Sequence, residues 1–238
     1  MTISYDKIPM LFQTVLDIPM YEGNGLRAHD IARPPAVAED HTMTLTGPPT
    51  WAQWPLSNLT ILSFNPATPD FLELSNANSL SMGFQAGMFS LAAWVFIDDL
   101  ANDKYIIEKG LLNTDGWIFM VDIVGAIRLL TNQGGAGQLS ASANGAITVA
   151  GWWLIGATRL TNSVRIYRNG VDVTATVGNH VNPAACARKL HVGIDDTELV
   201  GSNTQMDGYI WRPMVFNRQL SAIEMLQLFE STRALFGV

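Results

Sequence analysis

The sequence is poor in cysteine and in charge, and each shortage excludes a class of protein. Cys186 is the only cysteine among 238 residues, so no disulfide can form within the chain. Lysine and arginine number 14 against 21 aspartates and glutamates, a formal net charge of −7. Nucleic acids are bound through clusters of basic residues, and no such cluster occurs, so we expect no nucleic-acid partner. Charged residues make up 15% of the chain, against about 25% in ordinary soluble domains. We therefore expect a surface short of charge.

Long apolar segments are also missing. No stretch approaches the roughly 18 residues that a membrane-spanning helix needs, so we expect no insertion into a membrane. The N-terminal residues 1–9 lack the basic region and apolar core of a secretory signal peptide. These absences predict a protein that is made and folded in a reducing cytoplasm. There Cys186 is expected to be a buried thiol, because no motif pairs it with a histidine.

The common catalytic patterns do not occur either. Glycoside hydrolysis needs two carboxyl groups across the scissile bond, which alternating carboxylates on one strand can supply. No Glu-x-Asp-x-Glu triplet is present, and the nearest approach, Asp195-Asp-Thr-Glu198, predicts a turn. No Gly-x-Ser-x-Gly motif occurs. The four histidines are scattered without metal-binding spacing: His29, His41, His180 and His191. The sequence therefore predicts a protein that is not an enzyme.

Short strand patterns follow one another along most of the chain. In residues 89–96 both alternating faces are apolar, which predicts a central strand buried on both sides. Asn169-Gly170 predicts a two-residue hairpin with a type I′ turn, since that turn requires positive φ at both positions. The small-residue stretches 134–137 and 140–145 predict loops. Other strands are expected at 42–46 (on a sheet edge), 59–64, 70–74, 106–110, 116–122, 152–158, 190–193 and 208–210.

One helix is expected at the C-terminal end. Ser221 and Glu224 have the spacing of a capping box, and Leu220 and Met225 stand at the positions of a hydrophobic staple. A helix over residues 222–236 would carry an apolar stripe that packs on the sheets. The stripe is expected to contain Ile223, Leu226, Phe229 and Phe236.

The order of these strands, the phrase Val15–Gly25 and the closing phrase Asn217-Arg-Gln-Leu-Ser-Ala-Ile-Glu224 together resemble a known family. They are similar to the laminin-G-like branch of the concanavalin A-like lectin/glucanase superfamily. The resemblance implies an all-β fold, a two-sheet antiparallel jelly-roll sandwich with one C-terminal helix. We expect this domain to span residues 15–238, with an N-terminal arm of residues 1–14 in front of it.

The resemblance also implies where ligands and metals would bind. Laminin-G-like relatives often hold calcium with loop carboxylates, for which the candidates here are Asp98, Asp99 and Asp103 in one loop, or Asp195 and Asp196 in another. The alternative is that these aspartates only make solvated acidic loops. Candidate ligand-binding residues are Asp195, Asp196 and Trp211. Trp211 would stack on a sugar, with a core or interface position as the alternative. No other cofactor is expected.

Two functions remain open. The first is a non-catalytic structural or surface-interaction protein, namely a virion component such as a phage capsid decoration or head-surface protein, located on the virion surface. The second is a carbohydrate-binding module or lectin with glycan partners, whereas a glycoside hydrolase is disfavoured. The N-terminal arm is apolar, which indicates contact with other subunits in a homo-oligomer or capsid lattice. Its interface candidates are Tyr5, Ile8, Met10, Leu11 and Phe12.

Overall fold

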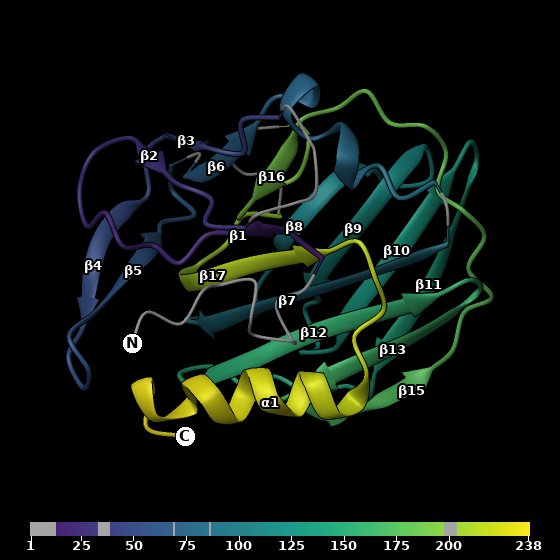
Figure 1. Cartoon of the computed structure of the whole chain (residues 1–238). Coiled ribbons are helices and arrows are strands. Elements are labelled where there is room, and N and C mark those ends of the chain that lie inside the picture. Colours follow the sequence, from purple (N-terminus) through teal and green to yellow (C-terminus); the bar gives the residue numbers. More distant parts are fainter. Residues whose placement is uncertain (1–12, 33–38, 69, 86, 198–203) are drawn as a thin grey trace.

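Two antiparallel sheets pack face to face, with one α-helix beside them, in the computed structural model (Figure 1). The structure describes residues 13–32, 39–68, 70–85, 87–197 and 204–238. The strand pairings within these ranges are antiparallel. The sandwich and its C-terminal helix confirm the fold class that the sequence predicts. No helix in the described ranges is both long and apolar enough to cross a membrane.

The eight-stranded sheet has β7 near its centre. Both faces of this strand are buried over most of its length, as its two apolar faces predict. Thr14, the last residue of the expected N-terminal arm, already pairs with Phe216. The order of the sheet is β14 (Val171–Asp172), β13 (Ser163–Arg168), β12 (Trp152–Leu160), β7 (Met88–Ile97), β17 (Gly208–Phe216), β5 (Leu59–Phe64) and β4 (Thr50–Trp54), and β1 (Thr14–Asp17) pairs with β17.

The nine-stranded sheet contains one strand where the sequence predicts loops. Residues 136–141 pair with β10 in six consecutive registers and belong to a strand that ends at Ser142, so the loop predictions are wrong for residues 136–137 and 140–142. Small residues such as glycine and alanine favour strands only weakly. Here pairing with the neighbouring strand outweighs this low preference. The order is β15 (Thr174–Thr176), β11 (Ala136–Ser142), β10 (Ile127–Gln133), β9 (Asp115–Val121), β8 (Lys104–Leu111), β16 (Leu190–Val192), β6 (Phe71–Leu74), β3 (Met43–Thr46) and β2 (Arg27–Ala28). The strand expected on a sheet edge, β3, lies one position inside it because β2 pairs with it.

The hairpin between β13 and β14 forms as the sequence predicts. Asn169 and Gly170 have φ values of 50° and 76°, which is the sign pattern of a type I′ turn. A Cβ atom on Gly170 would lie only 2.6 Å from Cα of Leu226 in the helix. Position 170 therefore requires glycine for two reasons: the positive φ of the backbone and the close approach of the helix.

The helix α1 (Ala222–Thr232) packs on the outer face of the eight-stranded sheet, where it lies alongside β12 and β13 (Figure 1). Ser221 and Glu224 form the predicted capping box. The predicted stripe is wrong in part, because Ile223 and Leu226 are 69% and 43% exposed. The buried residues of the helix are instead Met225, Leu228 and Thr232.

The C-terminal end of the chain closes an aromatic cluster on the same outer face. The Phe236 ring lies 4.4 Å from the ring of Trp94 and 4.3 Å from that of Trp152, measured between centroids. The indole N–H of Trp94 donates to the hydroxyl of Thr232 at 2.9 Å. Phe236 is 4% exposed, so the predicted contact of this residue with the sheets is confirmed.

Candidate functional site

The nine-stranded sheet carries a row of polar residues across five strands. Direct pairing joins Arg27 to Thr44, Thr44 to Glu73, Glu73 to His191 and His191 to Glu108. Side chains of directly paired residues point to the same face of a sheet. Their neighbours along the strands belong to the core between the sheets, so this row lies on the outer face. We call it the polar row.

The inner end of the polar row is buried. His191 and Glu108 are 0% and 1% exposed, and Nδ1 of His191 lies 3.4 Å from Oε1 of Glu108. Burial raises the pKa of Glu108 well above its ordinary value, and the nearby charges of Asp195 and Asp196 add to this effect. Burial therefore favours the neutral, protonated form of Glu108 over the charged form. Beside it lies a small apolar cluster on the same face: Tyr105, Ile118, Met120 and Leu130.

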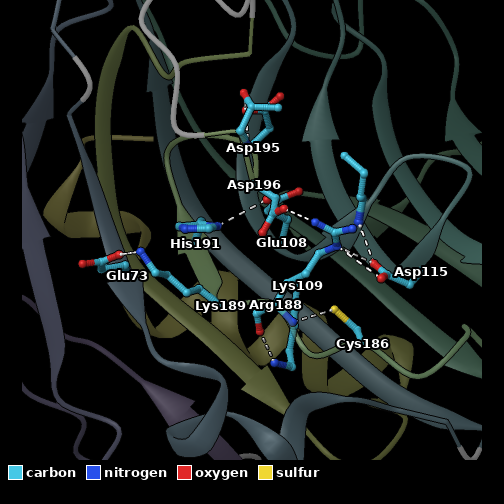
Figure 2. Close-up of polar contacts among 12 residues, drawn as sticks. Glu73, Glu108, Lys109, Asp115, Cys186, Arg188, Lys189, His191, Asp195 and Asp196 are labelled. Carbon is cyan, nitrogen blue, oxygen red and sulfur yellow. Dashed lines mark hydrogen bonds and ion pairs between the residues drawn. The ribbon is translucent and has the colours of Figure 1, made fainter.

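Arg188 links two carboxylates next to the polar row (Figure 2). Its Nε atom lies 2.9 Å from Oδ1 of Asp115, and its Nη1 atom contacts the carboxylate of Asp196. The backbone N–H of Arg188 donates to Sγ of Cys186 at 3.4 Å. Burial raises the pKa of the Cys186 thiol to about 11, so the thiol stays protonated and unreactive at neutral pH. Cys186 is half-buried, not fully buried as the sequence predicts.

Lys109 connects three segments of the chain next to the polar row, although no sequence pattern indicated this role. It is 1% exposed, and its Nζ atom donates to Oδ1 of Asn76 at 2.9 Å, to the hydroxyl of Ser79 at 2.9 Å and to the carbonyl of Arg188 at 2.7 Å. Desolvation lowers the pKa of this amine. Lys109 thus joins β8 to the segment after β6 and to the segment before β16.

A cavity of about 220 Å³ opens at the outer end of the polar row. Lys189 Nζ lies 2.6 Å from Oε2 of Glu73, and the hydroxyl of Thr46 donates to Oε1 of Glu73 at 3.3 Å. Both carboxylate oxygens are therefore engaged. Nη1 of Arg27 donates to the hydroxyl of Thr44 at 3.1 Å. Apart from Leu74 the lining is polar: Arg27, Thr42, Thr44, Glu73, Ser75, Asn78 and Lys189.

The ligand-binding residues expected from the sequence do not gather in this cavity. Asp196 holds Arg188, and Oδ1 of Asp195 accepts from the backbone N–H of Thr197 at 3.1 Å in a local turn. Trp211 belongs to the opposite sheet, is 3% exposed and packs against Phe236. A stacking platform needs an exposed ring face, so the structure places Trp211 in its alternative position, the core.

The expected calcium residues lie in one loop region but bind other partners. Oδ1 of Asp99 accepts from Nζ of Lys104 at 3.0 Å, and Oδ1 of Asp103 accepts from the backbone N–H of Ile123 at 3.2 Å. Asp98 is exposed. Among the residues that the structure describes, no group of three or more His, Cys, Asp or Glu side chains is placed to hold a metal ion. The three aspartates therefore do not converge on one point.

Some expected site residues fall outside the described ranges. They are Glu198 of the acidic turn and the arm residues Tyr5, Ile8, Met10, Leu11 and Phe12. Sequence reasoning missed the cavity because its residues come from five separate segments between β2 and β16. The one local signal was the alternation of Thr42 and Thr44 in the expected strand 42–46.

Comparison with known proteins gives structural matches at low sequence identity. No curated protein is significantly similar in sequence. Among solved structures, the botulinum neurotoxin serotype G binding domain matches with a TM-score of 0.69 and 15% identity, over 92% of this chain and 51% of that one. A sialidase from Trypanosoma rangeli matches with a TM-score of 0.62 and 15% identity, over 95% of this chain and 34% of the sialidase. The chain thus spans about half and one third of these two structures.

A match to a sequence-family model identifies the family, whereas the structural matches show the fold alone. A laminin-G-type family model, described as the concanavalin A-like lectin/glucanases superfamily, matches residues 68–225. This segment begins just before β6 and ends within α1, so it covers most of both sheets. The chain belongs to the concanavalin A-like lectin/glucanase superfamily.

Proposed function

We propose that the chain is a lectin-like domain that binds carbohydrate in the cavity at the end of the polar row. One observation carries this proposal: cross-strand register brings polar side chains from β2, β3 and β6 around a single cavity on the open sheet. Hydroxyl, amide and charged side chains are the groups that hydrogen-bond the hydroxyls of a sugar. The structural relatives fit this reading, since a botulinum neurotoxin of the same fold is described as dependent on two ganglioside molecules for cell entry.

Binding without hydrolysis fits the site better than catalysis does. A glycosidase places two carboxyl groups on either side of the scissile bond, about 5 to 9.5 Å apart. The lining of the cavity contains one carboxylate, Glu73, which is already bonded to Lys189 and Thr46. Glu108, the other carboxyl group of the polar row, is buried. An assay of reducing-sugar release from every bound glycan tests this point, and sustained release would identify an enzyme.

A glycan array with the purified chain tests the binding proposal. Thr44→Val removes one cavity hydroxyl and keeps a β-branched side chain suited to a strand. We expect weaker binding of every glycan that the wild-type chain retains. The matched control is Thr176→Val on β15, an exposed position at the far edge of the same sheet. An array without any bound glycan, in the presence and absence of calcium, would contradict the proposal.

A second function is favoured by a separate observation. Three apolar residues are exposed on the outer side of α1 and the adjoining hairpin, at 69%, 43% and 60% for Ile223, Leu226 and Val171. An apolar patch of this kind favours contact with other protein subunits. The role of a virion surface component, predicted from the sequence, stays a prediction, and this patch is the structural observation that favours it. Capsid genes next to the gene, and loss of particle binding in Ile223→Ser with Leu226→Ser, would support it, with Leu112→Ser as the exposed control.

A further inference from the structure

The side chains that line the cavity carry more positive than negative formal charge, although the chain as a whole is acidic. Its lining contains two cationic side chains, Arg27 and Lys189, and one carboxylate, Glu73, a formal charge of +1. The whole chain carries −7. A neutral sugar needs no excess of cationic groups, because hydroxyl and amide groups satisfy its hydrogen bonds. The charge of the lining therefore indicates an anionic ligand.

Arg27 has hydrogen-bond donors left for such a ligand. Its guanidinium has five N–H donors, and the one hydrogen bond it makes within the described residues is from Nη1 to Thr44. The carboxylate of Asp40 lies nearby, and its pKa is lowered by a hydrogen bond from the backbone N–H of Thr42 at 2.9 Å and by the charge of Arg27. Arg212 differs from Arg27 because its guanidinium is used by the protein itself: its Nε and Nη2 atoms donate to the carboxylate of Asp17 at 2.9 Å each.

We propose that the cavity binds a saccharide unit that carries a carboxylate, and that Arg27 receives this carboxylate through two of its N–H groups. The inference rests on the proposed function and names the class of sugar. The planar fork of a guanidinium matches a carboxylate in geometry. The hydroxyls of Thr42 and Ser75 and the amide of Asn78 then bond the ring hydroxyls of the same unit.

Glu73 has an opposite effect in this arrangement. Its carboxylate lies in the same cavity and repels a bound anion, while it also holds the amine of Lys189 at 2.6 Å. Replacing Glu73 with glutamine removes the repulsion and leaves Lys189 charged. The affinity for an acidic sugar should therefore increase in Glu73→Gln and decrease in Arg27→Gln. A purely structural role of these residues would not produce opposite signs.

The experiment compares carboxylated glycans with the same glycans as methyl esters, printed on one array. The best pair is then measured by calorimetry, together with a sulfated oligosaccharide that contains no carboxylate. We expect the acid to bind at least about tenfold more tightly than its ester, since a hydrogen bond to a charged group contributes on this scale. Arg27→Gln should remove this preference, and added salt should weaken binding of the acid.

A matched variant controls for the loss of one positive charge. Arg165 on β13 is exposed, belongs to the other sheet and contacts Asp172 at 3.7 Å. Arg165→Gln should bind the acidic glycan like the wild type, and thermal melts should show all variants folded.

The outcomes separate the two proposals. Equal binding of acid and ester overturns the inference and leaves a lectin. Unchanged binding in Arg27→Gln also overturns it, because another group must then hold the anion. Tighter binding of the sulfated oligosaccharide overturns the choice of carboxylate. An array without any bound glycan contradicts the proposed function itself.

Discussion

The two outer faces of the sandwich have opposite character. On the eight-stranded sheet, α1 and the C-terminal residues cover the face, and aromatic rings such as Trp94, Trp152 and Phe236 fill the space between them. On the nine-stranded sheet, the polar row ends in an open cavity lined by charged and hydroxyl side chains. The covered face extends the core and adds to stability, whereas the open face retains polar groups for a ligand. The contrast predicts that mutations on the first affect unfolding and mutations on the second affect binding.

The largest expected effect is on the covered face. Phe236→Ala removes a ring that contacts both Trp94 and Trp152, and it should lower the free energy of unfolding by about 3–5 kcal/mol. Urea denaturation measures this change. The control, Ile223→Ala on the same covering helix, is 69% exposed and should alter stability by less than about 0.5 kcal/mol. Equal effects of the two substitutions would show that the C-terminal end does not pack on the sheet.

A pair of glycines compares the two sheets directly. Gly170 and Gly135 both have positive φ, 76° and 79°, but a Cβ would meet Leu226 at Gly170 and nothing within 4 Å at Gly135. Gly135→Ala should cost about 1–2 kcal/mol for the strained backbone alone. Gly170→Ala should cost about 1–3 kcal/mol more, because the helix must move. Thermal melts of both variants measure the difference, and equal costs would place the helix farther from the hairpin.

The smallest expected effect on stability concerns Glu108, in the polar row of the nine-stranded sheet. The effect is close to zero at acid pH and grows as the pH rises. The pKa of Glu108 is raised by burial above the ordinary value of 4.5. Its stabilising contribution is therefore complete below pH 4.5 and is lost as pH rises through the pKa of the folded state. Glu108→Gln keeps the shape of the neutral acid and does not ionise. Its free energy of unfolding should fall less than that of the wild type between pH 5 and pH 9.

The control for this pH profile lies on the covering helix. Glu230 is exposed on α1 and pairs with Arg233, so Glu230→Gln should follow the wild-type profile. A Glu108→Gln profile parallel to that of the wild type would show that Glu108 ionises as freely in the folded protein as in the unfolded chain.

Local sequence patterns predicted the parts of the fold that local interactions determine. The type I′ turn at Asn169-Gly170 and the capping box at Ser221 depend on a few adjacent residues, and both formed. The apolar strand at residues 89–96 became a central strand because both sheet faces next to it are covered.

The helix stripe was wrong for a reason that lies far away in the sequence. Gly156 leaves a space on β12 that Met225 fills, since a Cβ on Gly156 would stand 2.4 Å from Cε of Met225. This space, and not the helix alone, selects Met225 and Leu228 for burial and leaves Ile223 and Leu226 exposed.

The site was harder to predict than the fold because it depends on strand register. Arg27, Thr44, Glu73 and His191 become neighbours only through pairings between β2, β3, β6 and β16. A shift of one residue in any of these pairings would turn a side chain to the other face. No pattern within a single segment contains that information.

The packing of the tryptophans has a spectroscopic consequence. Four of the seven tryptophans lie in the aromatic cluster that Phe236 closes: Trp54, Trp94, Trp152 and Trp211. Intrinsic fluorescence will therefore report chiefly on docking of the C-terminal segment that contains Phe236. Trp51 differs, because its indole N–H donates at 2.8 Å to the carbonyl of Gly25, two residues before Arg27. A ligand titration should thus show a small change in emission that disappears in Trp51→Phe, on top of a large signal that changes when the C-terminal segment detaches.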